Sequence, residues 1–527
     1  MKSFSASVSL VFLSASLVFG ASGGVVSGTV KGLDGAPFKG AFVRARNAET
    51  KITTSVVSNT RGLYRIQDLA PGEYTVRVEA VGYKSDPRTG VNVTDGGSLS
   101  LDFPLQKGMV RWSDISYYQG RMLLPPGKGR EVALERYDLC MACHGFESRM
   151  ATTRRDEAGW KRAVDFMRDP KSGMGYFLRP NQFTDQMAAD ATAYLTSVFG
   201  VDSDLPRSPA DLPKYKETVR PFSEEGTKLV YVDYELPGPN RMPWDAAPGK
   251  DGYVYMPYYG RGNQIGRLDS KTGKVEEFPV PNVGPAGLHS AVPAPDGTVW
   301  FTEQATNKIG KWDPQTKTIT EYQAPAPGGK HTIRFDSQGN IWTSGSPITR
   351  YDPKTGTFTP FREAGYAYGI AIDRNDIVYF AEFRENGKLG RLDPKTGKVT
   401  KWDTPTPDAR PRRIQVDSHG IVWFGEYQAG KMGRFDPKTE TIKEFPLPGP
   451  SPTPYALGID KYDRIWYSSE AMDVLGCLDP KTGKVVEYPT PYPENAMRDI
   501  FLDAEGRIWF SSPPNNRVGY FIPPPVN

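Results

Sequence analysis

Short runs of alternating apolar and polar residues fill positions 24 to 106, and Gly, Asp and Pro separate them. The runs at 25–30, 41–45, 62–66 and 74–78 follow this pattern. A period of two with frequent turns is typical of antiparallel strands that pack face to face. The pattern therefore predicts a small β-sandwich over residues 23–107.

From residue 108 the turn residues become rarer and apolar positions recur with a helical period. We expect helices at 132–139, at 156–167, which begins with acidic residues that suit the helix dipole, and at 184–200, which begins with the N-cap Thr184. Three helices predict a small all-α domain over 108–202, and a Pro-containing linker follows over 203–227.

The remaining residues, 228–527, form a repeat. Each unit holds an Asp before an aromatic strand, an Ile-Gly-Arg-Leu-Asp-like strand, a Lys-Thr-Gly turn and a strand that ends in Pro, which is typical of a β-propeller. The aromatic position occurs seven times and predicts seven blades: Tyr255, Trp300, Trp342, Tyr379, Trp423, Trp466 and Trp509. The last unit lacks its outer strand, and residues 229–237 look like that strand. We therefore expect the last blade to combine both ends of the repeat region.

Composition agrees with a multidomain, mainly β protein. The 527 residues include 54 Gly, 47 Pro and 12% aromatic residues, which favour short strands and exclude an all-helical protein. A formal net charge of +4 is too small over this length to indicate nucleic-acid binding. Three Cys exclude a disulfide scaffold, and four His exclude a His-rich metal store.

The first residues predict a signal peptide over 1–22. Lys2 precedes an apolar stretch from Val8 to Phe19, and small residues follow it. A membrane anchor is the alternative, but the stretch is short and interrupted by Ser. No later segment has about 18 uninterrupted apolar residues. We therefore expect an exported protein, periplasmic or secreted, without a transmembrane segment in the mature chain.

The strongest chemical signal is the C-x-x-C-H motif of Cys140, Cys143 and His144. Two thiols at this spacing can bond both vinyl-derived carbons of one porphyrin, and the adjacent imidazole can ligate its iron. A thioredoxin-like redox pair and a structural disulfide are the competing interpretations. Export and an α-helical setting favour one covalent haem c, with His144 as the proximal iron ligand.

A methionine is expected as the sixth iron ligand, because no other His lies in this segment. The segment resembles class I cytochromes c, whose C-terminal helix is similar to residues 184–200. Met174 stands where that resemblance places the methionine loop. Met167 ends a Trp160-x-x-x-Val164-x-x-Met167 pattern that resembles dehydrogenase-linked cytochrome domains. Both methionines stay open as the distal ligand, and we expect Met187 to pack in the core.

The Gly, Pro and aromatic pattern of residues 28–74 resembles the carboxypeptidase regulatory-like domain. The resemblance implies a seven-stranded, transthyretin-like sandwich. Its role would be that of a rigid spacer or docking module. Carbohydrate or partner binding is the alternative that this fold class offers.

The Ile-Gly-Arg-Leu-Asp-Pro repeats resemble the virginiamycin B lyase (streptogramin lyase) family. The resemblance implies a Mg²⁺ ion and a His general base in the propeller. In the last two blades, however, the positions of the family's catalytic His hold Tyr455 and Arg498. The chain departs there from the family's pattern for lysis.

Function within the propeller should depend on positions that differ between blades. One such position precedes each inner strand: His289, His331, Tyr368, Arg412, Tyr455 and Arg498, with Arg241 near the first blade. A second follows the aromatic strand: Glu303, Glu382, Glu426 and Glu470. We expect both sets to meet at the channel mouth.

These side chains could supply acid/base groups, a divalent-metal site and an anion site, or only a polar channel wall. Replacing His331 or Arg498 should lower turnover and leave the fold intact. We expect His419 to be exposed and Cys477 to be a buried free thiol.

Together these features predict an oxidoreductase that transfers electrons through its haem to an unknown redox partner. The coupled site would lie in the propeller channel and take a small-molecule or carbohydrate substrate. Two alternatives remain. One is a virginiamycin B lyase-like lyase with an ancillary haem, and the other is a partner- or carbohydrate-binding module with a haem relay.

Overall fold

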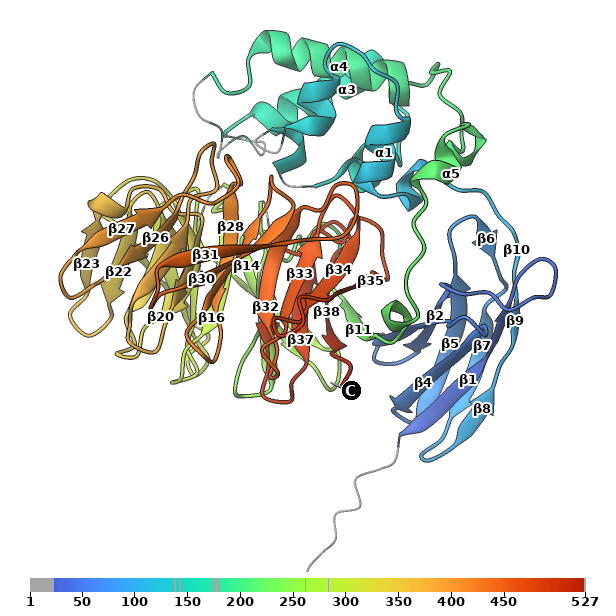
Figure 1. The fold of residues 1–527 in the computed structure, drawn as a ribbon. Helices are drawn as coiled ribbons and strands as arrows, with labels where there is room; N and C mark the ends of the chain where they lie inside the picture. Colours follow the sequence, from blue (N-terminus) through green and yellow to red (C-terminus); the bar gives the residue numbers. More distant parts are fainter. Residues whose placement is uncertain are drawn as a thin grey trace, which may run out of the picture.

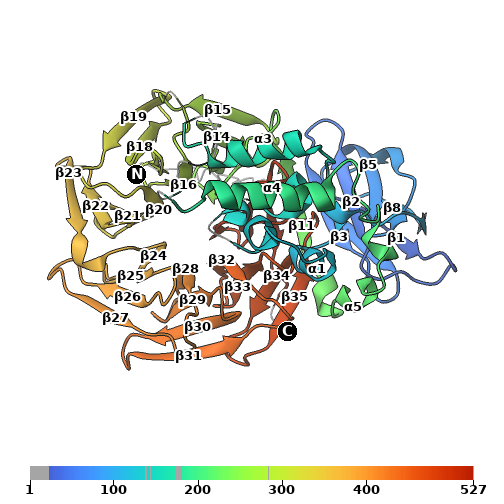
Figure 2. The ribbon, with the colours of Figure 1, turned by 90° about the horizontal axis from the view of Figure 1, so that it is seen from above.

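The computed structural model describes residues 23–136, 139–142, 144–171, 175, 178, 181–260, 262–282 and 284–525. The predicted signal peptide, Cys143 and Met174 lie outside the described residues. The described chain forms a sandwich, a helical segment and a ring of four-stranded sheets (Figure 1). Seen from above, α3 (Glu157–Arg168) and α4 (Asp185–Phe199) lie between the centre of the ring and the sandwich (Figure 2).

Two sheets face each other in the sandwich around a core of Val, Ile and Tyr side chains. The strands are β1 (Gly24–Lys31), β2 (Phe42–Asn47), β3 (Thr53–Val57), β4 (Leu63–Leu69), β5 (Gly72–Glu79), β7 (Arg88–Val93), β8 (Ser98–Ser100) and β9 (Phe103–Pro104). β8 and β9 pair with β1 in one continuous register. They are therefore two pieces of one edge strand, which gives the seven strands that the sequence pattern implied. β6 (Tyr83–Lys84) and β10 (Gln106–Lys107) form a separate ribbon.

Seven four-stranded blades form the ring, as predicted; six are separate sheets and the seventh is part of a larger sheet. The first three are β12 (Ala247–Pro248), β13 (Tyr253–Pro257), β14 (Gln264–Asp269), β15 (Val275–Pro279); β16 (Leu288–Pro293), β17 (Val299–Glu303), β18 (Lys308–Asp313), β19 (Thr318–Gln323); β20 (Lys330–Phe335), β21 (Ile341–Gly345), β22 (Ile348–Asp352), β23 (Thr357–Phe361). The next three are β24 (Gly369–Ile372), β25 (Val378–Ala381), β26 (Leu389–Leu392), β27 (Val399–Trp402); β28 (Pro411–Val416), β29 (Val422–Glu426), β30 (Lys431–Asp436), β31 (Thr441–Pro446); β32 (Pro454–Ile459), β33 (Ile465–Ser469), β34 (Val474–Leu478), β35 (Val485–Pro489).

The seventh blade combines both ends of the repeat region. β36 (Ile500–Leu502), β37 (Ile508–Ser512) and β38 (Arg517–Ile522) come from the last repeat, and β11 (Val230–Glu235) pairs with β38 antiparallel. The predicted closure is confirmed, because residues 229–237 supply the missing outer strand.

The recurring Asp and Trp have a shared structural role. The indole N–H of Trp342 donates a hydrogen bond of 2.8 Å to Asp336, six residues earlier, and Trp509 makes the same bond to Asp503. Trp423 and Trp466 repeat it. Each bond satisfies a buried indole and ties a strand to the turn before it, so these residues fold the blade and do not distinguish one blade from another.

The sandwich joins the ring through a continuous sheet, which the sequence analysis did not predict. β3 pairs with the free edge of β11, so blade seven continues into β3, β2, β5 and β7 as one eight-stranded sheet. An exposed strand edge offers unpaired N–H and C=O groups to other chains. The sandwich therefore covers the edge that the closing strand would expose.

Thr54→Pro should loosen this junction. Thr54 lies opposite Val232 on one side and Ala45 on the other, so a proline there removes a ladder donor inside the sheet. We expect a loss of about 2 kcal/mol in calorimetric unfolding, and faster proteolysis between sandwich and ring. Leu33→Pro is the control, because Leu33 is exposed in a turn closed by Gly35 and Gly32. Equal stability of the two variants would contradict the junction's role.

The helical segment begins with η1 (Trp112–Asp114), α1 (Tyr117–Leu123), η2 (Glu131–Glu135), η3 (Cys140–Ala142) and α2 (Phe146–Arg149), and then α3 and α4 follow. The helices predicted at 156–167 and 184–200 are confirmed, and Asp156 and Thr184 cap them. The helix predicted at 132–139 was wrong in extent. The backbone forms one π-helical turn, η2, and becomes extended at Arg136.

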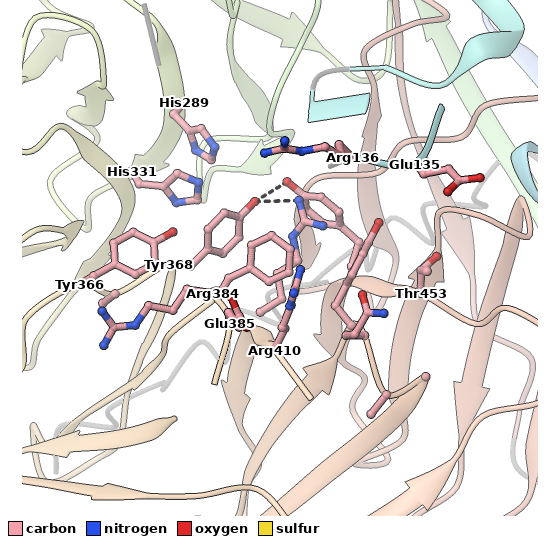
Figure 3. A pocket seen from close by; sticks show the side chains of 18 of the residues that line it. Glu135, Arg136, His289, His331, Tyr366, Tyr368, Arg384, Glu385, Arg410 and Thr453 are labelled. Carbon is pink, nitrogen blue, oxygen red and sulfur yellow. Dashed lines mark hydrogen bonds between the residues drawn. The ribbon is translucent and has the colours of Figure 1, made fainter. Parts of the chain in front are cut away.

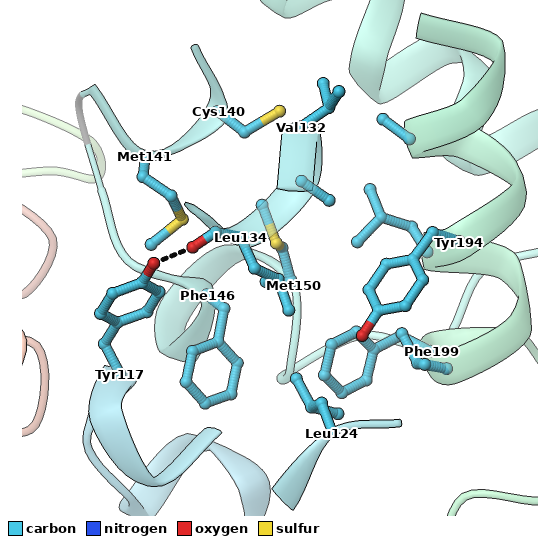
Figure 4. Close-up of a cluster of buried hydrophobic side chains, with 14 of the residues drawn as sticks. Tyr117, Leu124, Val132, Leu134, Cys140, Met141, Phe146, Met150, Tyr194 and Phe199 are labelled. Carbon is cyan, nitrogen blue, oxygen red and sulfur yellow. Dashed lines mark hydrogen bonds between the residues drawn. The ribbon is translucent and has the colours of Figure 1, made fainter. Parts of the chain in front are cut away.

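Buried side chains from all of these elements form one core (Figure 4). Cys140 belongs to it together with Val132, Leu134, Met150 and Phe199. The connection to the ring contains η5 (Pro209–Asp211), α5 (Tyr215–Thr218) and η6 (Glu225–Thr227). Among the described helices, none has the length and apolar character needed to cross a membrane.

Candidate functional site

A cavity of about 1200 Å³ lies between the mouth of the ring and the helical segment (Figure 3). Six of its lining side chains stand at or just before the innermost strands of successive blades: Trp244, His289, His331, Tyr368, Arg412 and Tyr455. The helical segment contributes Arg121, Glu131, Glu135 and Arg136. The side chains predicted to meet at the channel mouth therefore do lie together there, and the helical segment covers them.

The ring position of blade one is held by Trp244 and not by Arg241. Trp244 lies three residues before β12 and its indole is 4.5 Å from the guanidinium of Arg498. Arg241 instead pairs with Glu277 at 2.8 Å on the flank of the blade. The repeat pattern is weakest in this blade, so the alignment by sequence missed the aromatic residue.

Of the four glutamates predicted at the mouth, only Glu470 joins the ring. Its carboxylate lies 2.9 Å from Arg498 and 3.9 Å from Arg412, and it accepts a hydrogen bond from Tyr427. Glu303, Glu382 and Glu426 lie within the blades, beside Asn282, Lys401 and Glu444.

These glutamates face away from the cavity because side chains alternate between the two faces of the strand that carries them. The next residue along, Gln304, Phe383 or Tyr427, lines the cavity instead. Because successive side chains of a strand point to opposite sides, a prediction that is off by one residue selects the wrong side.

The glutamates within the blades differ in protonation. Burial and the neighbouring Glu444 charge raise the pKa of Glu426 to about 8. Burial also raises the pKa of Glu303 to about 7. For Glu382 burial acts in the same direction, but the hydrogen bonds from Lys401, Lys388 and Arg384 together outweigh it and lower the pKa. Only Glu382 is therefore a stable carboxylate in neutral solution.

Glu426→Gln should stabilise the protein increasingly as the pH rises from 5 to 8. The pKa of Glu426 is raised on folding, so the stability that its protonated form supplies is complete below the unfolded pKa and disappears as pH rises through about 8. Gln keeps the neutral shape, and the gain is at most about 1.4 kcal/mol per pH unit. Thermal melting across this range measures it.

Glu382→Gln is the matched control with the opposite sign. The pKa of Glu382 is lowered, so its contribution exists above the unfolded pKa and its removal should destabilise the protein at pH 8. A stability difference between Glu426→Gln and the parent that does not change with pH would contradict the assignment.

Arg412 lies in a box of aromatic rings. Its guanidinium carbon is 3.5 Å from the ring centroid of Tyr455, 4.2 Å from that of Phe383 and 4.5 Å from that of Tyr427. It also donates a hydrogen bond of 3.3 Å to the hydroxyl of Tyr368. Rings on several sides hold this cation at the base of the cavity.

Tyr368 and Tyr455 form a hydrogen-bonded pair with unlike protonation. Their hydroxyl oxygens are 2.5 Å apart. Burial raises the pKa of Tyr368. Burial acts in the same direction on Tyr455, but the charges of Arg412 and Arg498 outweigh it and lower its pKa below the ordinary value. Paired groups whose pKa values separate are candidates for proton transfer.

The two ring histidines are packed against each other, with centroids 3.6 Å apart. Burial lowers the pKa of both well below the ordinary value, and for His331 the charge of Arg413 adds to this. Both imidazoles are therefore neutral at pH 7, which makes them flat walls and hydrogen-bonding groups more than bases.

A second layer closes the channel beneath the ring. Arg413 donates to the carbonyl of Arg498 at 2.9 Å and to Thr332 at 2.7 Å, so it links three blades. Arg334 pairs with Asp499 at 2.9 Å. Burial and the Asp499 charge raise the pKa of Asp245 to about 7. The cavity is therefore reached from the side of the helical segment.

His144 has the environment of a metal-ligating histidine. It is buried, its Nδ1 lies 2.6 Å from the carbonyl oxygen of Gly145, and its Nε2 has no hydrogen-bond partner among the described residues. Such a carbonyl usually fixes the ring so that the other nitrogen can bind a metal. The donor fits an iron ligand. The cavity beside it measures about 20 Å³, enough for about one water, so a porphyrin requires these side chains to open.

The methionines of the helical segment differ in how deeply they are buried. Met167 is half-buried near the end of α3. Met187 packs against the core, as expected. Met141 and Met150 are buried beside Cys140 (Figure 4) and were not considered from the sequence. The described residues contain no cluster of three His, Cys, Asp or Glu side chains that could hold a metal ion.

The residues that follow His144 are docked directly on the ring of blades. Glu494 accepts hydrogen bonds of 2.7 Å from the backbone N–H groups of Gly145 and Ser148. The small cavity beside His144 is also lined by Glu470, which reaches Arg498 on its other side. Glu470 therefore lies between the small cavity beside His144 and the ring residues of the larger cavity.

His419 is exposed and Cys477 is a buried free thiol, as predicted. Trp244, Phe383, Tyr427 and the helical side chains of the cavity were missed. The signal available for Phe383 and Tyr427 was their place one residue after a recurring glutamate. For Arg136 and Glu135 no sequence pattern indicated contact with the ring.

Comparison with known proteins agrees with this architecture. The carboxypeptidase regulatory-like domain matches residues 25–106. A streptogramin B lyase structure is 26% identical, covering 57% of this chain and 99% of its own, with a TM-score of 0.52. A virginiamycin B lyase from Staphylococcus aureus is 24% identical, covering 56% and 100%, with the same TM-score. No curated protein sequence matches the chain.

The virginiamycin B lyase family itself matches residues 224–350 and 353–523, which together are more than half of the chain. This chain therefore belongs to the virginiamycin B lyase family.

Proposed function

We propose that this protein is an exported c-type haem oxidoreductase whose substrate occupies the cavity between the ring and the helical segment. Cys140 and Cys143 would hold the haem by thioether bonds, and His144 would ligate its iron. When bound, the haem supplies a one-electron acceptor next to the site. The observation that carries the proposal is the docking of the chain next to His144 on the ring of blades, with Glu470 lining the small cavity beside His144 and pairing with Arg498 on its other side.

The ring residues have separate roles in this proposal. Arg412, which lines the cavity, attracts and orients an anionic group of the substrate, and the buried Arg498 adds positive charge behind it. The lowered pKa of Tyr455 favours its phenolate form; as the phenolate it would take up the proton that leaves the substrate and become the neutral phenol, and Tyr368 holds it by their hydrogen bond. Glu470 is the single acidic residue of this ring, so the residues do not fit a divalent-cation site such as Mg²⁺. The substrate therefore binds the arginines directly.

A lyase is the second candidate, because the family membership favours it. The same Tyr455 could remove a proton without any change in oxidation state. The two functions differ in one observable. A substrate that is oxidised reduces the haem under anaerobic conditions, whereas a substrate that is cleaved by elimination leaves the haem spectrum unchanged.

The sixth iron ligand provides a separate prediction. Met167→Ala, or Met174→Ala if the loop methionine is the ligand, should abolish the weak sulfur-to-iron absorption band in the far red and lower the reduction potential, because a thioether ligand favours reduced iron. Met187→Ala is the control from the same segment. An intact band in both variants would exclude both methionines and direct attention to Met150.

A further inference from the structure

We infer that the cavity at the ring mouth takes a planar aromatic carboxylate. This inference rests on the proposed function for the assignment of that ligand as substrate. The binding itself depends only on the walls of the cavity, which are rich in rings and in arginine.

The walls offer flat aromatic faces in unusual number. They include Trp244, Tyr259, His331, Tyr368, Phe383 and Tyr455. Trp244 and Tyr259 stack with centroids 4.0 Å apart, and His331 lies 4.2 Å from Tyr368. Flat faces at ordered angles stack on a flat ligand, whereas a puckered ring meets them poorly.

The charge of the site favours an anion. Glu470 is 2.9 Å from Arg498 but 3.9 Å from Arg412, so one carboxylate serves two guanidinium groups. Arg412 is almost completely buried, and a buried cation without a close anion is costly. A ligand carboxylate would supply the close anion that Arg412 lacks, and it would match the guanidinium in shape and charge.

Charged side chains, four arginines among them, also line the part of the cavity above the ring. Arg121, Arg136, Arg384 and Arg410 line it above the ring, against Glu131, Glu135 and Glu385. Figure 3 shows Arg136 beside the histidines, above Tyr368, with Glu135 farther to the right. Arg384 and Arg410 already pair with Glu382 and Asp408. The attraction for an anion therefore rests on Arg412 at the base of a cavity that the helical segment helps to enclose. The volume of about 1200 Å³ accommodates one or two rings with water.

Calorimetric titration of the full exported protein at pH 7.5 in 0.1 M salt tests the inference with three probes. Benzoate has ring and charge, cyclohexanecarboxylate has the charge without the flat ring, and benzyl alcohol has the ring without the charge. We expect benzoate to bind at least fivefold more tightly than either. Equal binding of cyclohexanecarboxylate, equal binding of benzyl alcohol, or no benzoate binding would each overturn the inference.

Two variants locate the ligand. Arg412→Gln should weaken benzoate at least tenfold and leave benzyl alcohol unchanged, and His331→Ala should weaken benzoate more than cyclohexanecarboxylate. Arg434→Gln and His419→Ala are the matched controls, because both side chains lie outside the cavity. If Arg412→Gln does not fold, the probe series on the parent protein and His331→Ala decides alone.

The failure of this inference can be told from failure of the proposed function. Haem reduction by a non-aromatic substrate, without benzoate binding, overturns the aromatic carboxylate alone. Tight benzoate binding to a protein that carries no haem on Cys140 overturns the oxidoreductase alone.

Discussion

Replacing Cys140 and Cys143 together by Ser removes all covalently bound haem from the exported protein and abolishes its visible absorption. The expected loss is complete, because the two thioethers are the only covalent links that the proposal gives the haem. His144→Ala should instead keep the haem attached and lose the low-spin spectrum, since it removes an iron ligand and leaves both thiols. Absorption spectra after acid–acetone extraction measure both effects.

Cys477→Ser is the matched control, because Cys477 is a buried free thiol within blade six. It should change neither colour nor extraction. If the parent protein releases its haem on extraction, or is colourless when exported, the haem assignment fails.

Arg498→Ala should lower the stability of the ring by about 3–5 kcal/mol. The Arg498 side chain is fully buried, lies 2.9 Å from Glu470 and stacks on Trp244 and Tyr455. Its removal leaves Glu470 without its close cation and opens a void among the rings. From the sequence alone the fold was expected to survive this change, because the Trp and Asp repeats are untouched; the complete burial of Arg498 leads us to expect a loss instead.

Denaturant unfolding of Arg498→Ala and of Arg434→Ala measures the effect. Arg434 is partly exposed and only 3.9 Å from Asp436 at its nearest, so its loss should cost less than about 1 kcal/mol. Equal stability of the two variants would contradict the role of the buried pair. Turnover should fall in His331→Ala without this loss of stability, because His331 makes no ion pair in the described structure.

The seven-bladed propeller could be predicted because the residues that stabilise each blade recur along the sequence. The Asp–Trp bonds repeat in blade after blade, and the missing outer strand of the last repeat matched one strand before the first. The pairing of β3 with β11 could not be predicted, since a strand edge is recognised through backbone groups that leave no mark on the sequence.

The site was predicted only in part. The position before each inner strand was recognised in six blades. Its residue type differs from blade to blade, whereas the residues that stabilise the blade recur. It was missed in blade one, where Trp244 replaces the expected arginine. The glutamates were selected by recurrence, but recurrence marked residues that fold the blade, and of the four only Glu470 pairs with the ring residues Arg498 and Arg412. The cover from the helical segment depends on how separate parts of the chain dock, which local patterns do not encode.

The most direct test of the account is the haem spectrum of the exported protein during anaerobic incubation with aromatic carboxylates, with product formation followed in the same sample. The account predicts that a turned-over substrate reduces the haem in the parent protein, and that reduction slows at least tenfold in His331→Ala, a loss of about 1.4 kcal/mol of transition-state stabilisation. Turnover with an unchanged haem spectrum would contradict it and would assign the cavity to a lyase.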